Sequence, residues 1–349
     1  MDVHIMTFGA SLRIKDGLFE VLTPQPPDGK TFLRHEYAVS HIKSIWVHSA
    51  VSISSAALRL AIENDIDFVL CDHHGMPLGR FTPHRPNTTA AVQKAQLIIS
   101  QTPHAITYVK EWVTAKLTHQ ATFLREIGSR RKSSDIQKVC KTAAKKIEDI
   151  VLKIKALEGK HISDIADVLR GMEGESGRIY FDTLKAALPK YYQFEGRTRQ
   201  PAEDLFNAFL NYGYAILYNR VEIAVTKAGL NPFLGFLHRD EFGGFRAFVF
   251  DAIEPYRIEI ERIVFKLFSG KQVSYEQHGA VAQTDKSGIW LSGDGKKLIA
   301  ARFAESFDNW HTKLTTSMQH TAATMRKHLS AQHTEDITEP LHVLPHVFG

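Results

Sequence analysis

The pattern of apolar and polar positions changes character near residue 82. Before that point, apolar residues occur in short runs that are typical of β-strands: residues 3–8, 12–14, 18–22, 42–47 and 66–70. Lys15-Asp16-Gly17 separates two of these runs and is typical of a hairpin turn. Ser52 or Ser54 is a candidate cap for one short helix that runs through Asn64. We therefore expect a small, β-sandwich-like domain with one helix.

From about residue 89 onward, the apolar positions follow the spacing of α-helices. Helices are predicted at residues 92–99, 112–127, 136–157, 165–171, 180–188, 204–230, 248–270 and 298–329. The predicted fold class is α+β, with an N-terminal β-strand-rich domain followed by a larger all-α domain. The predicted boundaries are 1–82 for the β-rich N-terminal domain, 83–90 for a linker, 91–330 for the α-helical domain and 331–349 for a flexible tail.

Composition indicates a globular protein with a mildly basic surface. The 349 residues are 44% hydrophobic and 23% charged, and the formal net charge is +5. This charge is uneven, because residues 110–160 contain 13 Lys or Arg and 6 Asp or Glu. Such a segment is either the solvated face of long helices or a surface that binds a polyanion.

The two cysteines and the apolar runs exclude several classes of protein. Cys71 and Cys140 are too few for a disulfide framework and lack the spacing of a zinc site. The N-terminus does not have the pattern of a signal peptide, and no uncharged run approaches the about 18 residues that span a membrane. We expect a cytoplasmic protein with no membrane partner.

The strongest candidate chemistry lies in two segments of the helical region. His238 ends an apolar turn that contains Gly and Pro, and the carboxylates Asp251 and Glu254 follow it. Positions three apart share a helix face, so these two carboxylates can point together at whatever His238 faces. One nitrogen and one or two oxygen ligands suit a divalent metal, which can support phosphate chemistry.

A third acidic position lies upstream, where Glu173 interrupts an apolar helical pattern. If this carboxylate faces inward it needs a partner, and a metal ion would be one. The alternative is an acid that interacts with the dipole at a helix N-terminus, and Glu175 is a rival for the same role. Glu173, His238 and Glu254 come from three helical segments, and sites between facing helices are a common construction.

Several basic residues are candidates for contact with phosphate. Arg197 and Arg199 lie in a Gly- and Pro-flanked loop before a helix, which suits bidentate phosphate contact but also suits a solvated surface loop. Residue type and neighbourhood add Lys227, Arg239 and Arg257 to the candidate DNA-binding set. Asn207, within an apolar helix face, is expected to be buried and bonded to backbone.

Taken in order, these segments resemble one known family, the CRISPR-associated adaptation integrase, which is the nuclease subunit that inserts new spacers. The resemblance covers roughly residues 5–310 of the chain. It rests on residues 52–58, 68–75, Lys116 with Gln120 and Leu124, Glu173 with Gly174, residues 197–201, Asn207, residues 212–215, 229–238 and 251–257.

The resemblance implies a catalytic site that contains Glu173, His238, Glu254 and Asp251. It implies Mg²⁺ or Mn²⁺ held by Glu173, His238 and Glu254. Family members often carry Asp where this chain has Glu254, which leaves coordination by Asp251 open. In the implied reaction, a 3′-OH of incoming DNA attacks a phosphodiester, and water as the nucleophile would give nicking instead.

The resemblance also implies partners, and two alternative functions stay open beside it. The implied partners are double-stranded DNA with 3′-OH ends, CRISPR repeat DNA, a second copy of the chain in a homodimer, and a small companion adaptation subunit in a heterohexameric integration complex. The resemblance implies that the N-terminal domain, 1–82, is the dimerisation domain and that the α-helical domain, 91–330, is the catalytic domain. One alternative is a related mobile-element DNA integrase. The other is a non-catalytic DNA-binding subunit that acts through the basic segment 110–160. A hydrolase of small phosphoesters is weaker, since no nucleotide-binding Gly-rich loop is present.

Overall fold

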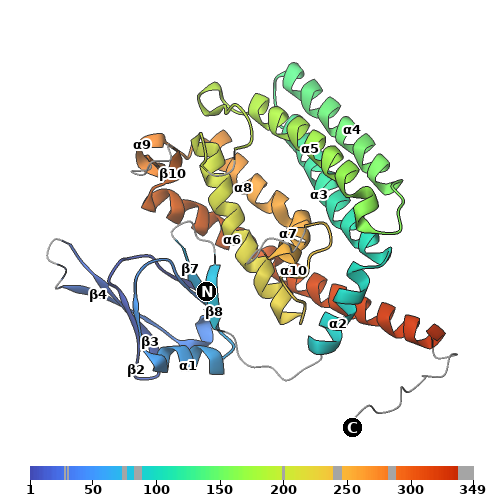
Figure 1. The fold of residues 1–349 in the computed structure, drawn as a ribbon. Coiled ribbons are helices and arrows are strands. Elements are labelled where there is room, and N and C mark those ends of the chain that lie inside the picture. The colour runs from blue at the N-terminus through green and yellow to red at the C-terminus, as the bar shows by residue number, and fades with distance from the viewer. Residues whose placement is uncertain are drawn as a thin grey trace, which may run out of the picture.

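The chain forms a strand-rich N-terminal part and a larger helical part, as Figure 1 shows for this computed structural model. The structure describes residues 1–26, 29, 31–72, 77–81, 89–198, 201–238, 246–281 and 288–336. This arrangement confirms the fold class predicted from the sequence. The domain boundaries stay predictions, and most of the expected linker at 83–90 lies outside the described residues.

The described strands of the N-terminal part form two four-stranded sheets. One has the order β1-β5-β7-β8 and contains Asp2–Ile5, Ser44–Val47, Asp67–Cys71 and Pro77–Phe81. Its first three strands are parallel, and β8 is antiparallel to β7. The other has the order β4-β3-β2-β6 and contains Phe32–Tyr37, Leu18–Pro24, Ser11–Lys15 and Ser52–Ile53.

The predicted hairpin and the predicted short helix are both present. Strands β2 and β3 pair antiparallel across a turn in which Asp16 and Gly17 both have positive φ, the backbone form that favours tight hairpins. Helix α1, Ser55–Glu63, begins after Ser54, whose side chain accepts a hydrogen bond from the Ala57 amide at 3.2 Å. The cap is therefore Ser54 rather than Ser52, which lies in β6.

Helix α6 lies on the side of the helical part that faces the strands, and α8 and α10 pack against it (Figure 1). Residues such as Leu217, Val221 and Val225 of α6 are fully buried, and nearly all of this helix belongs to the core. The described helices are α2 (Thr89–Ser100), α3 (His104–Ser129), α4 (Ser134–Lys155), α5 (Ile162–Ala187), α6 (Leu205–Lys227), α7 (Ala247–Ala252), α8 (Arg257–Ser269), α9 (Tyr275–His278) and α10 (Gly293–Asp336). Short 3₁₀ turns are η1 (Val39–His41), η2 (Lys190–Tyr192) and η3 (Glu254–Tyr256), and a small hairpin is formed by β9 (Gly279–Val281) and β10 (Ile289–Leu291).

Three helix predictions were wrong in detail. The predicted pair at 165–171 and 180–188 is one helix, α5, which begins after His161 and continues through its glycines. The predicted helix at 248–270 is divided into α7, η3 and α8, because Pro255 lacks the amide hydrogen that a continuous helix needs there. The last helix continues to Asp336, beyond residue 331, where the sequence predicts a flexible tail.

Helix α6 also joins the two parts of the molecule. The guanidinium of Arg220 forms an ion pair with Asp2 of β1 and lies 4.6 Å from the ring centre of Trp46 in β5. Lys227, at the end of α6, forms an ion pair of 2.9 Å with Asp67 of β7.

Over the residues that the structure describes, no helix combines the length and the apolar character needed to cross a membrane.

Candidate metal centre

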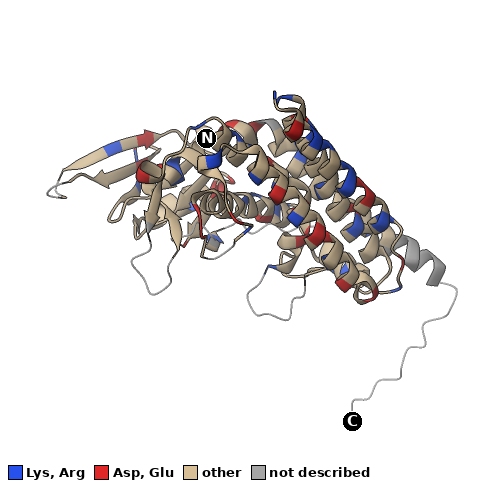
Figure 2. Ribbon diagram, turned by 90° about the horizontal axis from the view of Figure 1, so that it is seen from above, with Lys and Arg blue, Asp and Glu red and all other residues tan. Residues whose placement is uncertain are grey.

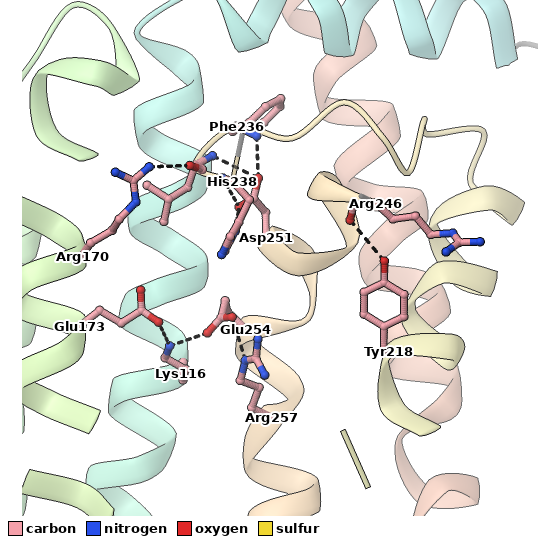
Figure 3. Close-up of polar contacts among 11 residues, drawn as sticks. Lys116, Arg170, Glu173, Tyr218, Phe236, His238, Arg246, Asp251, Glu254 and Arg257 are labelled. Carbon is pink, nitrogen blue, oxygen red and sulfur yellow. Dashed lines mark hydrogen bonds and ion pairs between the residues drawn. The ribbon is translucent and has the colours of Figure 1, made fainter. Parts of the chain in front are cut away.

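Two acidic side chains from different elements meet at one buried lysine. Glu173 of α5 and Glu254 of η3 each form an ion pair with Nζ of Lys116 on α3, as Figure 3 shows. The side chains of Lys116 and Glu254 are only 8% and 5% exposed, whereas that of Glu173 is 27% exposed. The second oxygen of Glu254 accepts a hydrogen bond from Nε of Arg257 at 2.8 Å. Both oxygens of Glu254 therefore contact cations.

The charges in this cluster stabilise one another. Burial raises the pKa of Glu254. The neighbouring charges of Arg257 and Lys116 lower it by more than burial raises it, and the pKa is about 2. Burial lowers the pKa of Lys116, and the carboxylates of Glu254 and Glu173 more than reverse this effect. Glu254, Lys116 and Arg257 are therefore ionised at neutral pH.

His238 is oriented by Asp251, the last acidic residue of α7. The Oδ1 atom of Asp251 lies 2.6 Å from Nδ1 of the imidazole, and the carboxylate is 2% exposed. It also accepts hydrogen bonds from the backbone amides of Phe236, Leu237 and His238 at 2.6, 3.2 and 3.2 Å. Because Nδ1 faces a carboxylate, Nε2 is the nitrogen that a metal would use. Figure 3 shows the imidazole directed toward the cluster of Glu173 and Glu254.

The turn that carries His238 has a specific local construction. A Cβ atom on Gly235 would lie 2.6 Å from the Cβ of Ala247, so the close approach of the turn to α7 requires glycine. The buried amide of Gln96 accepts from the Asn231 amide at 2.8 Å and donates to the carbonyls of Asn231 and Leu234 at 3.0 and 2.9 Å. The sequence did not identify Gln96, although a glutamine within an apolar helix face was a signal for it.

The structure gives different surroundings to Glu173 and Glu175 of α5. It also gives different partners to Asp251 and Glu254, the two acidic residues that follow His238. Glu175 is exposed, whereas Glu173 is half-buried and faces Lys116. Asp251 contacts His238 and the backbone of its turn, while Glu254 contacts Lys116 and Arg257. These contacts give Asp251 the geometry of a group that orients His238, and they give Glu254 the geometry of a potential ligand.

The donor types of this site fit a hard divalent cation. Two carboxylates and an imidazole nitrogen are ligands that Mg²⁺ or Mn²⁺ accepts. The carboxylates already converge on a positive charge, the ammonium group of Lys116, so the position favours a cation. Across the described ranges, however, no three His, Cys, Asp or Glu side chains stand in the arrangement of an assembled metal site. The donor atoms of Glu173, Glu254 and His238 therefore suit a divalent metal. In this structure the two carboxylates are paired with Lys116.

The candidate DNA-binding residues differ in their placement. Arg197 donates to Asn207 at 3.0 Å and to Asn211 at 2.6 Å, Lys227 pairs with Asp67, and Arg257 pairs with Glu254. These three therefore bind protein groups. Arg199 and Arg239 lie outside the described residues.

Asn207 is fully buried, as expected. Its side chain donates to the Gly196 carbonyl at 2.8 Å and accepts from the Thr198 amide at 3.1 Å, which holds the loop before α6.

A buried polar network lies beside the cluster and was assigned no role from the sequence. Glu261 of α8 accepts hydrogen bonds from Gln120 at 3.2 Å and from the Tyr214 hydroxyl at 2.8 Å. The ring of Tyr214 lies below the guanidinium groups of Arg197 and Arg257, at 5.4 and 5.1 Å. Burial, followed by the charge of Glu261, raises the pKa of Tyr214 well above its ordinary value. This tyrosine is therefore a neutral hydrogen-bond donor that supports Arg257.

Comparison with known proteins agrees with this fold. A family model described as CRISPR associated protein Cas1 matches residues 3–305. The CRISPR-associated endonuclease Cas1 1 of Archaeoglobus fulgidus is 29% identical over 314 residues, which cover 86% of this chain and 87% of that protein. The CRISPR-associated endonuclease Cas1 of Hyperthermus butylicus is 31% identical over 196 residues, covering 56% of this chain and 57% of that protein.

Solved structures share the whole architecture at low sequence identity. A casposase bound to integration product has a TM-score of 0.77 and 18% identity, with coverage of 100% of this chain and 96% of that chain. A Cas1 protein from Thermotoga maritima has a TM-score of 0.70 and 17% identity, with coverage of 93% and 96%. A chain of a Cas6-RT-Cas1–Cas2 complex has a TM-score of 0.74 and 20% identity, with coverage of 94% and 35%.

The strand-rich part, the helical part and the family match together define a protein of the CRISPR-associated class. The family model spans most of the sequence, including every residue of the cluster. The chain belongs to the Cas1 family.

Proposed function

We propose that this chain is a divalent-metal-dependent DNA endonuclease and strand-transfer integrase that inserts short DNA fragments into a CRISPR array. The observation that carries the proposal is that Glu173 and Glu254, from two separate elements, meet at one charged, largely buried position toward which the imidazole of His238 is directed. Glu173, His238 and Glu254 are the proposed ligands of Mg²⁺ or Mn²⁺, and Asp251 is the proposed orienting residue of His238.

The chemistry follows from these side chains. When bound, a divalent cation would neutralise phosphoryl oxygens and help to orient the attacking hydroxyl. The oxygen of an incoming 3′-OH forms a new bond to the target phosphorus, and the bond from that phosphorus to the target's 3′ oxygen breaks. The hydroxyl loses its proton to solvent, and the released 3′ oxygen takes up a proton from solvent. Asp251 fixes the imidazole of His238 through Nδ1, and Arg257 holds the carboxylate of Glu254 in place. Water in place of the hydroxyl gives a nick.

The outer face of α4 supports DNA as the partner. Six lysines of this helix are exposed: Lys138, Lys141, Lys145, Lys146, Lys153 and Lys155. Lys145 pairs with Asp149 at 3.0 Å, and the other five form no ion pair with any residue whose placement is described. Figure 2 shows basic positions along the outermost helices of the helical part. Clustered lysines of this kind contact phosphates independently of base sequence.

The proposed partners extend beyond the DNA duplex. We propose a homodimer formed through the strand-rich part, and a small companion subunit that completes a heterohexameric integration complex. A chain of a Cas1–Cas2 complex has the same fold, which supports the companion subunit. Size-exclusion chromatography with light scattering tests the dimer directly.

The likeness to a casposase favours one alternative, a mobile-element integrase, because that structure matches the chain over its full length. The two functions differ in their DNA. A CRISPR integrase is expected to prefer a target that contains a CRISPR repeat, whereas the alternative would join element ends to a different target.

The test is a strand-transfer assay with a short duplex that has 3′-OH ends, a supercoiled target with a CRISPR repeat, and Mg²⁺ or Mn²⁺. Transfer is expected to fall at least about 100-fold in Glu173→Gln and in His238→Ala, and to stop in EDTA. Glu175→Gln is the matched control, since it removes an exposed carboxylate from the same helix. Transfer that persists in EDTA, or in both site variants, contradicts the proposal. Tight DNA binding with neither transfer nor nicking supports the non-catalytic alternative.

A further inference from the structure

The proposed metal ligands already contain an internal cation. The ammonium of Lys116 contacts both Glu173 and Glu254, and the residue is 6% exposed on the inner face of α3. Arg257 contacts the other oxygen of Glu254. The charge of the two carboxylates is therefore balanced before a divalent ion arrives.

A second cation cannot join this cluster without a cost. Repulsion between like charges is large in a buried site, because the local dielectric response is weak. A divalent ion between Glu173 and Glu254 would lie beside the ammonium of Lys116 as well as the guanidinium of Arg257. One of these groups must move, or the affinity for the metal must fall.

Lys116 is the group that is free to move. Arg257 is held by its hydrogen bond to Glu254 and by the ring of Tyr214, which lies 5.1 Å from its guanidinium. Among the residues that the structure describes, Lys116 forms ion pairs with these two carboxylates and with no other acidic group. Its ammonium is a compact charge on a flexible four-carbon chain.

We propose that Lys116 is an internal counter-cation that competes with the divalent metal for Glu173 and Glu254, so that metal binding displaces its ammonium group. This inference rests on the proposed metal site. The displaced ammonium lies next to any phosphate that reaches the metal, and the phosphate supplies a new counter-charge. Metal and DNA therefore each increase the affinity for the other, as linkage between two ligands requires.

Removal of the ammonium separates this role from a purely structural one. In Lys116→Met, the apolar length of the side chain is retained, and the two carboxylates lose a shared cation. The metal-free protein is expected to be less stable, and its affinity for a metal ion is expected to be higher. A lysine that only supports the fold would lower the stability and leave the metal affinity the same or weaker.

The experiment is calorimetric titration of Mn²⁺ into the wild-type protein and variants without DNA, at fixed ionic strength. Lys116→Met is expected to bind Mn²⁺ at least tenfold more tightly than the wild type and to show a larger increase in melting temperature with Mn²⁺. Lys185→Met is the matched control, because Lys185 lies on α5, the helix that carries Glu173, and pairs with a different carboxylate, that of Glu195, at 2.9 Å. Lys185→Met and Lys116→Arg are expected to resemble the wild type. An unchanged or weaker affinity in Lys116→Met overturns the inference.

Two further measurements keep the result decisive. If Lys116→Met does not fold, the ¹⁵Nζ signals of lysine in the wild type are followed by NMR during Mg²⁺ titration. Displacement is expected to shift the protected ammonium signal of Lys116, and an unchanged signal at saturating Mg²⁺ overturns the inference. Glu173→Gln tests the proposed metal site separately. Mn²⁺ affinity equal to that of the wild type would contradict the metal site itself. Loss of Mn²⁺ binding supports the metal site, and the Lys116 variants then test the competition between Lys116 and the metal.

The linkage to DNA gives a final arm of the same experiment. A duplex with 3′-OH ends is expected to tighten Mn²⁺ binding by the wild type and to have a much smaller effect on Lys116→Met. Equal effects on both proteins would overturn the proposed link between the displaced ammonium and the phosphate.

Discussion

Asp251 lies against His238 with 2.6 Å between Oδ1 and Nδ1, and the same carboxylate accepts hydrogen bonds from three successive backbone amides of the turn that carries the histidine. One buried side chain thus fixes both the ring and the backbone from which the ring extends. A change at Asp251 must therefore act on the proposed metal site through His238.

Asp251→Asn tests this relationship. Asparagine keeps one acceptor oxygen but presents an amide nitrogen to donors of the turn, so it is expected to lower the stability by about 1–3 kcal/mol. The affinity for Mn²⁺ is expected to fall about 10–100-fold, as for other groups that orient a ligand histidine. Calorimetric titration and urea denaturation measure the two effects. Asp149→Asn, on the exposed face of α4, is the control, and wild-type Mn²⁺ affinity in Asp251→Asn would contradict the assignment.

The depressed pKa of Glu254 predicts a pH dependence of stability. Burial raises this pKa, while Arg257 and Lys116 lower it, from the ordinary 4.5 to about 2. As the pH falls from 4.5 toward 2, the unfolded carboxyl gains a proton before the folded one does, so the stabilisation is complete above pH 4.5 and is lost toward pH 2. A depression of this size corresponds to on the order of 3 kcal/mol.

The comparison of the wild type with Glu254→Gln measures this contribution. The difference between their free energies of unfolding in urea is expected to be largest above pH 4.5 and to decrease on acidification. A difference that is constant from pH 7 to pH 3 would show that the charge of Glu254 contributes nothing to stability.

Two of the ion pairs between the strand-rich and helical parts differ in their burial. Arg220 and Asp2 are mostly buried, whereas Lys43 and Asp308 are exposed and lie 3.2 Å apart. Arg220→Met leaves Asp2 buried without its partner and is expected to cost about 3–5 kcal/mol. The pair of Lys43 and Asp308 joins the same two parts, and Lys43→Met is expected to cost less than about 1 kcal/mol. Denaturation followed by tryptophan fluorescence, to which Trp46 beside Arg220 contributes, distinguishes them, and equal costs would contradict the assigned role of Arg220.

The basic face of α4 predicts a salt-dependent affinity for DNA. The triple variant Lys138→Gln, Lys141→Gln and Lys145→Gln is expected to bind duplex DNA more weakly. It is also expected to reduce the slope of log affinity against log salt concentration by up to about 3 units. Fluorescence anisotropy in EDTA at several salt concentrations measures both quantities.

The control for this prediction removes the same charge from other surfaces. Lys15, Lys271 and Lys297 are exposed residues that lie outside α4. If their replacement by glutamine lowers the affinity and the slope equally, the effect depends on net charge alone, and the face of α4 is not the contact.

The sequence predicted those parts of the fold whose signal is local. The turn at Lys15-Asp16-Gly17 defines its hairpin, and Ser54 defines the start of α1. Strand β4 was missed because it is exposed along almost its whole length, so its apolar residues, such as Phe32 and Leu33, do not alternate between a buried and an exposed face. The continuity of α5 was missed because its glycines resemble a break, and the packing of α5 against α3 and α4 overrides that local tendency.

The candidate site was predictable in its residues but not in its contacts. Glu173 and His238 were conspicuous as polar residues in apolar surroundings. The role of Lys116 was not predictable, since its two partners are 57 and 138 positions away in the sequence. The sequence also gave no means to separate the partners of Asp251 from those of Glu254, because that separation depends on how the turn before α7 packs.

Gly235 has a consequence for the evolution of this chain. The turn approaches α7 so closely at this residue that even a methyl group does not fit. Random mutagenesis with selection for the proposed strand-transfer activity should therefore find position 235 intolerant of every replacement, although the residue has no chemistry of its own. A position that contributes only the absence of a side chain would then limit sequence drift as strictly as the histidine it serves.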